Sequence, residues 1–475
     1  MFLGIDLGTG SVKTTIVDYD GNVVTAATRR YSNSAPVPGH EEIWPDVWWD
    51  EVVAAVRECC QDRGMDVAGI GLSGQAHGFV LIGSDEQPLR PAILWTDLRT
   101  TREVTDILAL PADLRSPLCN PITVGMAGPG ILWVQRNEPE IWQKTRKVLA
   151  AKDWLKLKLT GEVSTEPSDA SMTCMYDVVA DCWSTELITK MGLEYDVLPQ
   201  IGKSAACAGR LRKSAAEILG LPVGIPISGG LADTASCLLG MGISKPGDTV
   251  LQIGSGIQIM TVVDEPTPEI QPFYNTFRAI DDVVYKMAAM QNGGTAFEWV
   301  RNALNADWDE MYRAAFEPNP GNGGIVFLPY ACGERAPILD PHAAASFTNM
   351  HIGSTRENLI RSIFEGVALA IRDSWDALAK TGVEASGFLV TGGGSRDVRW
   401  RQLIADIVRV NLIRCSTTAD ATKGAAYLGG LAAGHWASYE DLPIDGSTGE
   451  TLRPCEMDVY APNLAEFRRT YYALK

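Results

Sequence analysis

The fold of this 475-residue chain is decided by Leu3-Gly-Ile-Asp-Leu-Gly-Thr-Gly-Ser-Val-Lys-Thr-Thr-Ile-Val-Asp18. Two apolar runs, 2–6 and 12–18, flank the turn Gly8-Thr9-Gly10, and each run is typical of a buried strand. Asp20-Gly21 is a dipeptide that favours a tight hairpin, so a third strand is expected after it. The sequence therefore predicts an antiparallel strand meander at the start of the chain.

The same pattern returns near the midpoint, in Leu251-Gln-Ile-Gly-Ser-Gly-Ile-Gln-Ile-Met-Thr-Val-Val-Asp264. Both copies contain an apolar strand, a glycine-rich turn, a second apolar strand and an aspartate. A chance echo is the alternative, because strand–turn–strand patterns are common. The repeat favours a duplicated domain, with the connection over 240–248, where glycine and proline supply linker residues.

Composition narrows the class of protein. The chain is 46% hydrophobic and carries a formal net charge of −17, which suits an ordered globular protein and counts against an extended nucleic-acid surface. Its ten cysteines form no C-x-x-C pair, so reduced thiols in the cytoplasm are expected. We expect no membrane span, since no run of about 18 apolar residues occurs.

The first candidate site is the turn Gly8-Thr9-Gly10 together with Asp6 and Lys13. Backbone N–H groups of a glycine turn can approach phosphate oxygens closely, and the Thr9 hydroxyl adds a donor. Lys13 can reach a terminal phosphate, and Asp6 can hold Mg²⁺, usually through water. An ordinary hairpin turn is the alternative, because the segment matches neither the P-loop nor the Rossmann pattern.

A second candidate is Asp233, which follows Gly229-Gly230 at the start of a predicted helix and precedes Thr234. An exposed carboxylate in this position can take the proton from a hydroxyl that attacks phosphorus. A helix N-terminal aspartate that satisfies backbone N–H groups is the commoner use of such a residue. The local pattern leaves both interpretations open.

Three further loops could bind ligand. Gly254-Ser255-Gly256 repeats the turn of the first site, and Gly392-Gly393-Gly394 lies between a buried strand and a helix, where backbone could face a nucleotide. The loop around Ala76 and His77 is polar, flanked by glycines, and could bind a polyol. Tight turns and a loop histidine without ligand are the alternatives.

Seven segments along the chain form an ordered set. They are Gly4-Ile-Asp-Leu-Gly-Thr-Gly10 with Lys13, Gly71-Leu-Ser-Gly-Gln-Ala-His-Gly78, Arg90-Pro-Ala-Ile-Leu-Trp95, Leu132-Trp-Val-Gln-Arg-Asn-Glu-Pro-Glu140, Gly229-Gly-Leu-Ala-Asp233, Phe327-Leu-Pro-Tyr-Ala-Cys-Gly-Glu-Arg-Ala-Pro337 and Gly392-Gly-Gly-Ser-Arg-Asp-Val-Arg-Trp400. One such motif is a weak signal, but seven in order are specific. Together they resemble the FGGY carbohydrate kinase family, and within it the xylulokinases, and the similarity runs along nearly the whole chain.

The resemblance implies an α/β fold of two actin-like (ribonuclease H-like) ATPase domains with a deep cleft between them. These would span 1–243 and 244–440, and a C-terminal tail, 441–475, would pack on the body. It also implies transfer of the ATP γ-phosphate to a sugar hydroxyl, which is the 5-hydroxyl if the sugar is D-xylulose.

The resemblance also implies roles for single residues. It gives Asp233 as the catalytic base and Asp6 as the aspartate near Mg²⁺ and the phosphates. The sugar contacts implied by position are Ala76, His77, Asp233 and Thr234, and the nucleotide contacts are Gly254, Ser255, Gly393 and Gly394. Many members of the family are dimers, so a homodimer stays open.

The chain departs from the xylulokinase pattern around the sugar. Ala76-His-Gly-Phe79 stands where many xylulokinases have Met-His-Gly-Ala, and Thr234 stands where they often have Asn. Turn Gly254-Ser-Gly-Ile257 and segment Trp95-Thr-Asp-Leu-Arg99 also differ from the usual Gly-Thr-Ser-Gly and Trp-Asn-Asp-x-Arg. Because hydrogen-bonding mismatches alter discrimination strongly, ribulose, erythrulose, gluconate or glycerol remains open as the acceptor. A non-catalytic sugar or nucleotide sensor on this fold is a more distant alternative.

Overall fold

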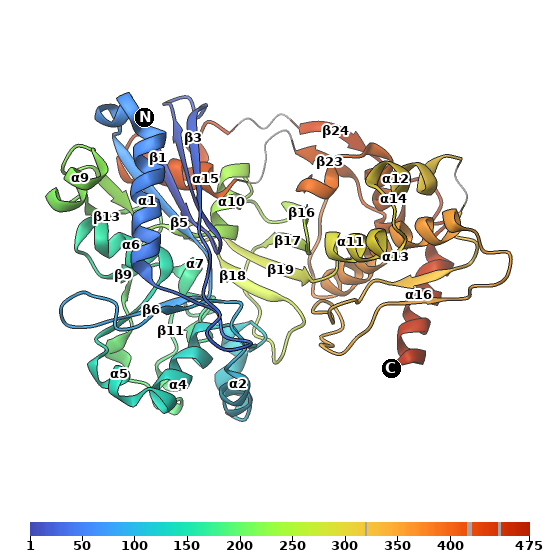
Figure 1. Cartoon of the computed structure of the whole chain (residues 1–475), viewed down its shortest axis with the longest axis horizontal. Coiled ribbons are helices and arrows are strands. Elements are labelled where there is room, and N and C mark those ends of the chain that lie inside the picture. Colours follow the sequence, from blue (N-terminus) through green and yellow to red (C-terminus); the bar gives the residue numbers. More distant parts are fainter. Residues whose placement is uncertain (319–320, 416–419, 445–447) are drawn as a thin grey trace.

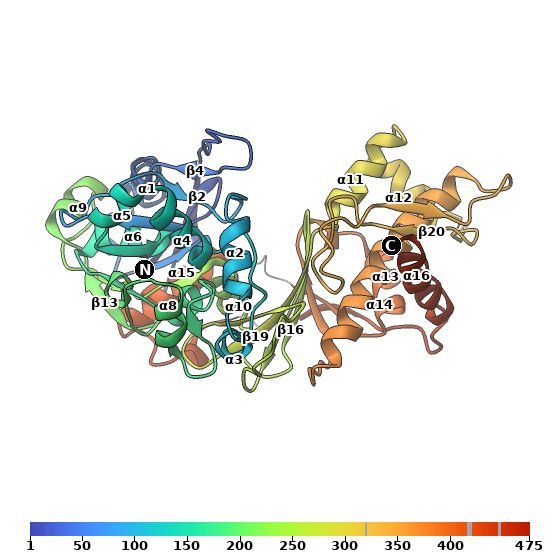
Figure 2. The same ribbon diagram turned by 90° about the horizontal axis from the view of Figure 1, so that it is seen from below.

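The computed structural model describes residues 1–318, 321–415, 420–444 and 448–475. Two lobes, each built around one seven-stranded sheet, lie side by side (Figure 1). Figure 2 shows the same two lobes from below, with strands β16 and β19 of the second sheet on the side of the second lobe that faces the first. None of the described helices is both long and apolar enough to cross a bilayer.

The first sheet has the strand order β13-β14-β5-β1-β2-β3, with β15 beside β5. Its central strand β1 runs antiparallel to β2 and parallel to β5. The strands that build the sheet are β1 (Phe2–Leu7), β2 (Ser11–Val17), β3 (Val23–Arg30), β5 (Gly69–Gly74), β13 (Cys207–Arg210), β14 (Pro226–Ser228) and β15 (Leu231–Ala232).

The second sheet repeats this arrangement in the order β18-β19-β17-β16-β22-β23-β24. Strand β16 runs antiparallel to β17 and parallel to β22, as β1 does to β2 and β5. The midpoint echo in the sequence therefore corresponds to two equivalent strand pairs. The strands are β16 (Thr249–Ile253), β17 (Ile257–Val263), β18 (Asn275–Arg278), β19 (Val284–Met290), β22 (Phe388–Thr391), β23 (Leu412–Cys415) and β24 (Thr448–Leu452).

Helices cover both sheets, and several begin with a clear N-terminal signal. Helix α13 starts after Thr355, whose hydroxyl accepts a hydrogen bond from the Asn358 backbone N–H at 3.2 Å, in a capping box. The main helices are α1 (Pro45–Cys60), α4 (Ala127–Asn137), α6 (Ala151–Thr160), α10 (Asp233–Met241), α11 (Gly294–Ala303), α12 (Trp308–Phe316), α13 (Arg356–Ala379), α14 (Val398–Val408), α15 (Ala421–Ala432) and α16 (Ala461–Leu474).

Helix α15 lies against the first sheet, although its residues fall in the range 244–440 expected for the second domain. The approach is close because glycines face it: a Cβ on Gly71 would lie 1.6 Å from the carbonyl oxygen of Ala425, and one on Gly4 would lie 2.0 Å from that of Thr422. The helix also contacts α10, where the Ser236 hydroxyl donates to the Ala421 carbonyl at 2.8 Å. A helix from the range expected for the second domain thus packs in the first lobe, and the proposed domain ranges stay a prediction.

The range 441–475, expected as a tail packed on the body, supplies ordered elements of the second lobe. Strand β24 pairs with β23 at the edge of the second sheet. Helix α16 is held to α13 by Arg468, which pairs with Asp373 at 2.6 Å and Asp376 at 2.9 Å.

The glycine contact with α15 gives a stability prediction. We expect Gly71→Ala to lower the free energy of unfolding by about 3 kcal/mol, because the new methyl group would force the helix away from β5. Urea denaturation followed by circular dichroism measures the change. Gly202→Ala is the matched control, since a Cβ there meets its nearest atom, the Thr165 oxygen, at an ordinary 3.7 Å. Equal stabilities of the two variants would contradict the packing argument.

Candidate active site

Two carboxylates lie at the carboxyl ends of two strands, β1 and β15, that each run parallel to β5. Asp6 lies near the end of β1, directly opposite Ser73 of β5, and the Ser73 hydroxyl donates to Asp6 Oδ1 at 2.9 Å. Strand β15 also runs parallel to β5 and ends at Ala232, immediately before Asp233. The carboxyl edge of a sheet with parallel strands is the usual place for ligands in α/β proteins.

Asp6 lies in a strongly acidic environment. Burial, together with the nearby Asp233 and Asp420, raises the pKa of Asp6 to about 7, while Ser73 and Lys13 oppose the shift. Asp420 caps α15 by accepting hydrogen bonds from Thr422, and sequence analysis missed it at this site. Three carboxylates around one lysine favour a bound cation.

The oxygen donors at this edge fit Mg²⁺. No group of three or more His, Cys, Asp or Glu side chains is placed to hold a metal within the described ranges. Magnesium at kinase sites typically takes one or two carboxylates, with phosphate oxygens and water completing its shell. The carboxylates near this edge are those of Asp6, Asp233 and Asp420.

The turn after β1 is tied to both strands and to a distant tryptophan. The Gly8 N–H donates to the Ser11 carbonyl at 3.0 Å, and a Cβ on Gly10 would meet no atom within 4 Å. The Trp95 indole N–H donates to the Thr9 hydroxyl at 2.8 Å. Lys13 is exposed on β2, directly opposite Asp6. The turn therefore leaves backbone and Lys13 open to a ligand.

Asp233 combines the two interpretations left open by its sequence. It is the first residue of α10, and its Oδ1 accepts the Thr234 backbone N–H at 2.6 Å and the Thr234 hydroxyl at 3.2 Å. Its Oδ2 accepts no hydrogen bond from the described residues, and the side chain lines a cavity. Burial raises the pKa of Asp233, whereas Thr234 and Lys13 act in the opposite direction. One oxygen thus serves the helix start, and the other is available for chemistry.

His77 is fixed in one orientation beside this cavity. Its backbone has a φ of 65°, and its Nδ1 lies 2.7 Å from the Met172 carbonyl oxygen. Burial, aided by the charge of Arg335, lowers the pKa of His77 to about 4, while the Met172 carbonyl opposes the shift. The ring is therefore neutral near pH 7, with its proton on Nδ1 toward the carbonyl and Nε2 left as an acceptor.

The His77 environment predicts a pH-dependent stability. The pKa falls from an ordinary 6.5 to about 4 on folding, so the unfolded chain binds more protons between these values. Stability conferred by the neutral ring is present above 6.5 and is lost as pH falls toward 4, by up to about 3 kcal/mol. Asparagine tolerates positive φ, so it should fit the backbone at position 77. In urea titrations, we expect the free energy of unfolding of His77→Asn to fall less between pH 7.5 and pH 5 than that of the wild type. The exposed His342→Asn is the control, and identical pH profiles of all three proteins would contradict the assignment.

The cavity holds side chains from both lobes and has a volume of about 210 Å³. Ala76, His77, Asp233 and Thr234 line it from the first lobe, so the predicted sugar-contacting residues lie around one space. Phe79, which could have refilled the room left by Ala76, is buried elsewhere. A Cβ on Gly130 would lie 2.4 Å from the Phe79 ring. The second lobe contributes Gln258, Asn275 and Arg335, which the sequence did not single out.

The predicted nucleotide loops lie together on the second lobe. A Cβ on Gly394 would lie 2.4 Å from the Ile253 side chain, directly before the turn Gly254-Ser255, while one on Gly393 would meet no atom within 4 Å. The start of α11 joins them, because the Gly294 N–H donates to the Gly254 carbonyl at 2.8 Å. The described lining of the His77 cavity does not include these loops. The two sets of predicted phosphate and nucleotide contacts therefore come from different lobes: the turn Gly8-Thr9-Gly10 from the first, and the glycine loops from the second.

A buried charge network supports the segment before Asp233. Lys152 pairs with Asp153 at 2.8 Å, Asp169 at 3.0 Å and Glu166 at 3.2 Å, and all four side chains are at most 3% exposed. Lys156, also fully buried, donates to the Gly229 carbonyl at 3.0 Å. The network fixes the glycine turn that carries the candidate base.

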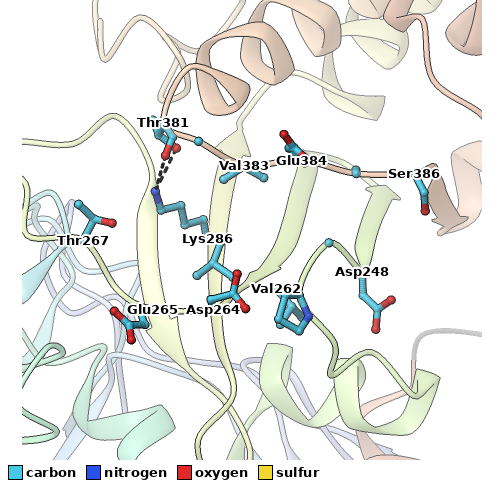
Figure 3. Close-up of a pocket in the computed structure, with 15 residues that line it drawn as sticks. Asp248, Val262, Asp264, Glu265, Thr267, Lys286, Thr381, Val383, Glu384 and Ser386 are labelled. Atoms are coloured by element: carbon cyan, nitrogen blue, oxygen red, sulfur yellow. Dashed lines mark hydrogen bonds between the residues drawn. The ribbon is translucent and has the colours of Figure 1, made fainter.

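A second cavity, about 860 Å³, lies on the second lobe apart from these residues (Figure 3). Lys286 of β19 lies in it and donates to the Thr381 hydroxyl at 3.0 Å. Met287, the next residue, lines the His77 cavity, so the two cavities lie on opposite faces of β19. None of the predicted site residues lines this second cavity.

Two protein-family models match the chain. The model for the N-terminal domain of the FGGY family of carbohydrate kinases matches residues 1–240, and the model for its C-terminal domain matches residues 250–433. The xylulose kinase of Escherichia coli (strain K12) is 30% identical over 485 aligned positions, which cover 100% of this chain and 99% of that protein.

Solved structures of similar proteins share the fold. The crystal structure of a xyloylose kinase from Brucella ovis is 33% identical, with a TM-score of 0.94, and the match covers 100% of this chain and 99% of that one. A gluconate kinase from Lactobacillus acidophilus has the same TM-score of 0.94 at 23% identity, covering 99% and 97% of the two chains, a likeness of fold alone. The prediction of an α/β fold with two actin-like domains is confirmed.

Proposed function

The chain belongs to the FGGY family of carbohydrate kinases, and from this premise we propose that it phosphorylates a ketopentose with ATP, converting D-xylulose to D-xylulose 5-phosphate. The observation that carries the proposal is the small cavity where Asp233 and His77 meet. Its volume of about 210 Å³ lies below the roughly 300–1,000 Å³ of drug-sized ligand sites, which suits a small polyol. The xylulose kinase relatives support the choice of sugar.

The proposed reaction starts with an acceptor hydroxyl beside the free Oδ2 of Asp233. As the hydroxyl oxygen attacks the γ-phosphorus, its proton passes to Oδ2, a new O–P bond forms, and the bond from phosphorus to the ADP oxygen breaks with its electron pair on ADP. His77 accepts a hydrogen bond from a sugar hydroxyl at Nε2 and so orients the acceptor. Closure of the lobes would bring the γ-phosphate to the acceptor and exclude water.

The phosphates would be held from both lobes. The turn Gly8-Thr9-Gly10 and Lys13 would face the transferred phosphate, while Gly254, Ser255, Gly393 and Gly394 would contact the nucleotide. Asp6 would hold Mg²⁺, through water, and the bound metal would neutralise developing phosphate charge. We also propose that the protein is located in the cytoplasm, as its cysteine usage led us to expect.

The residues of the cavity wall also allow acceptors other than D-xylulose. Ala76 leaves space that Phe79 does not occupy, and Thr234 offers a hydroxyl where an amide is common in xylulokinases. Ribulose, erythrulose, gluconate or glycerol could match this wall better than D-xylulose, because buried polar mismatches discriminate strongly. A non-catalytic sensor would bind sugar and form no phosphorylated product.

A substrate panel tests the proposal. Purified protein is incubated with Mg²⁺ and ATP and with each ketose, polyol or sugar acid in turn, and both ADP and the phosphorylated product are measured. We expect the highest kcat/KM for D-xylulose. A higher value for another acceptor would replace the substrate, and sugar binding without product from any acceptor would favour the sensor.

A further inference from the structure

Arg335 brings a positive charge of the second lobe to the wall of the cavity that holds His77 and Asp233. Its backbone is fixed in place: the Ala336 N–H donates to the Ala289 carbonyl of β19 at 3.0 Å, and the Leu339 N–H donates to the Arg335 carbonyl at 2.6 Å. The segment Phe327–Pro337 contributed to the family resemblance, but the proposed mechanism gives it no part.

The neighbouring carboxylate is already committed to other donors. Glu334 accepts the backbone N–H groups of Gln291 at 2.6 Å and Arg335 at 2.8 Å, and the Asn292 amide at 3.1 Å. The Arg335 guanidinium makes no hydrogen bond or ion pair with any side chain or backbone group in the described ranges. The residue is exposed at the cavity wall. A guanidinium carries a rigid fork of N–H donors, and this one has room to bind a ligand.

The position of Arg335 relates it to one end of the cavity. Arg335 lines the cavity from the second lobe, whereas Asp233 lines it from the first lobe. An acceptor whose reacting hydroxyl lies at Asp233 can therefore extend its other end toward Arg335.

We propose that Arg335 is an acceptor-binding residue, whose guanidinium binds two neighbouring oxygen atoms at the acceptor end remote from Asp233. This inference rests on the proposed kinase function and deepens it. The pair is the carbonyl and adjacent hydroxyl of a ketose, or the carboxylate of a sugar acid, since both match a planar fork of donors. Because His77 and Arg335 belong to different lobes, the acceptor itself bridges them.

The test compares Arg335→Met and Arg335→Lys with the wild type, using the best acceptor from the panel. We expect the acceptor KM to rise at least about tenfold in Arg335→Met, as loss of charge-assisted hydrogen bonds requires, and the ATP KM to change little. Arg335→Lys keeps the charge without the fork and should be intermediate. Arg313→Met, on the exposed face of α12, is the matched control. A rise in the ATP KM alone, or an unchanged acceptor KM, would overturn the proposal.

Truncated acceptors make the test independent of overall folding. For a ketose, D-xylulose is compared with 1-deoxy-D-xylulose, which lacks the oxygen on carbon 1; for a sugar acid, gluconate is compared with glucitol. The wild type should prefer the complete acceptor, and Arg335→Met should lose that preference. A preference retained in full by Arg335→Met would refute the contact. Failure of the kinase proposal is seen separately, as absence of any phosphorylated product with the wild type.

Discussion

Asp233→Asn is expected to lower kcat by about 10³-fold, within the range that a positioned general base contributes. Asparagine has nearly the same shape and can still accept the Thr234 backbone N–H, so the start of α10 should persist. It cannot take the proton from the acceptor hydroxyl. The substitution therefore separates the base from the helix-start role.

The measurement is ADP release at saturating ATP and acceptor, together with acceptor binding by calorimetry. Binding should change little, because the cavity keeps its shape. Asp307→Asn is the matched control: Asp307 also begins a helix, α12, and its side chain accepts the Glu310 N–H at 2.7 Å. This control should retain wild-type kcat. Activity of Asp233→Asn within about tenfold of wild type would leave only the helix-start interpretation.

Features set by nearby residues could be predicted from sequence. The two strand–turn–strand units depend on apolar runs and glycine turns within about twenty residues, and both occur in the structure as β1–β2 and β16–β17. Helix α13 (Arg356–Ala379) has a long run of apolar residues at helical spacing, a pattern that predicts a helix from sequence. Such elements carry their own signal.

The composition of the cavity could not be predicted in the same way. Asp420 approaches Asp6 only because α15 returns to the first sheet, and Arg335 shares a cavity with His77 only because side chains of both lobes line that space. These pairs are hundreds of residues apart, and no periodicity relates them. The family resemblance gave the segment that contains Arg335, but no role for its guanidinium.

Lys152 is a residue whose burial the local sequence pattern would not predict. Lysines in a helix such as α6 are normally placed on the solvent face. Here Lys152 and Lys156 are both 0% exposed, in contact with Asp153. Burial alone would lower the pKa of Lys152, but Asp153, Asp169 and Glu166 raise it well above its ordinary value. The lysine is thus held charged by its neighbours.

Lys152→Met is therefore expected to cost about 3–5 kcal/mol of unfolding free energy, because it leaves buried carboxylates without their main counter-charge. Urea denaturation measures this loss. Lys158→Met, on the same helix but with its ammonium over the Trp49 ring, should lose far less. The double variant Lys152→Met/Asp169→Asn should recover part of the stability, since it also removes a carboxylate whose pKa burial raises. Strict additivity of the two substitutions would show that the network does not act as a unit. We also expect the Lys152→Met variant to lose activity, because Lys152 packs on Gly230, in the turn that carries Asp233.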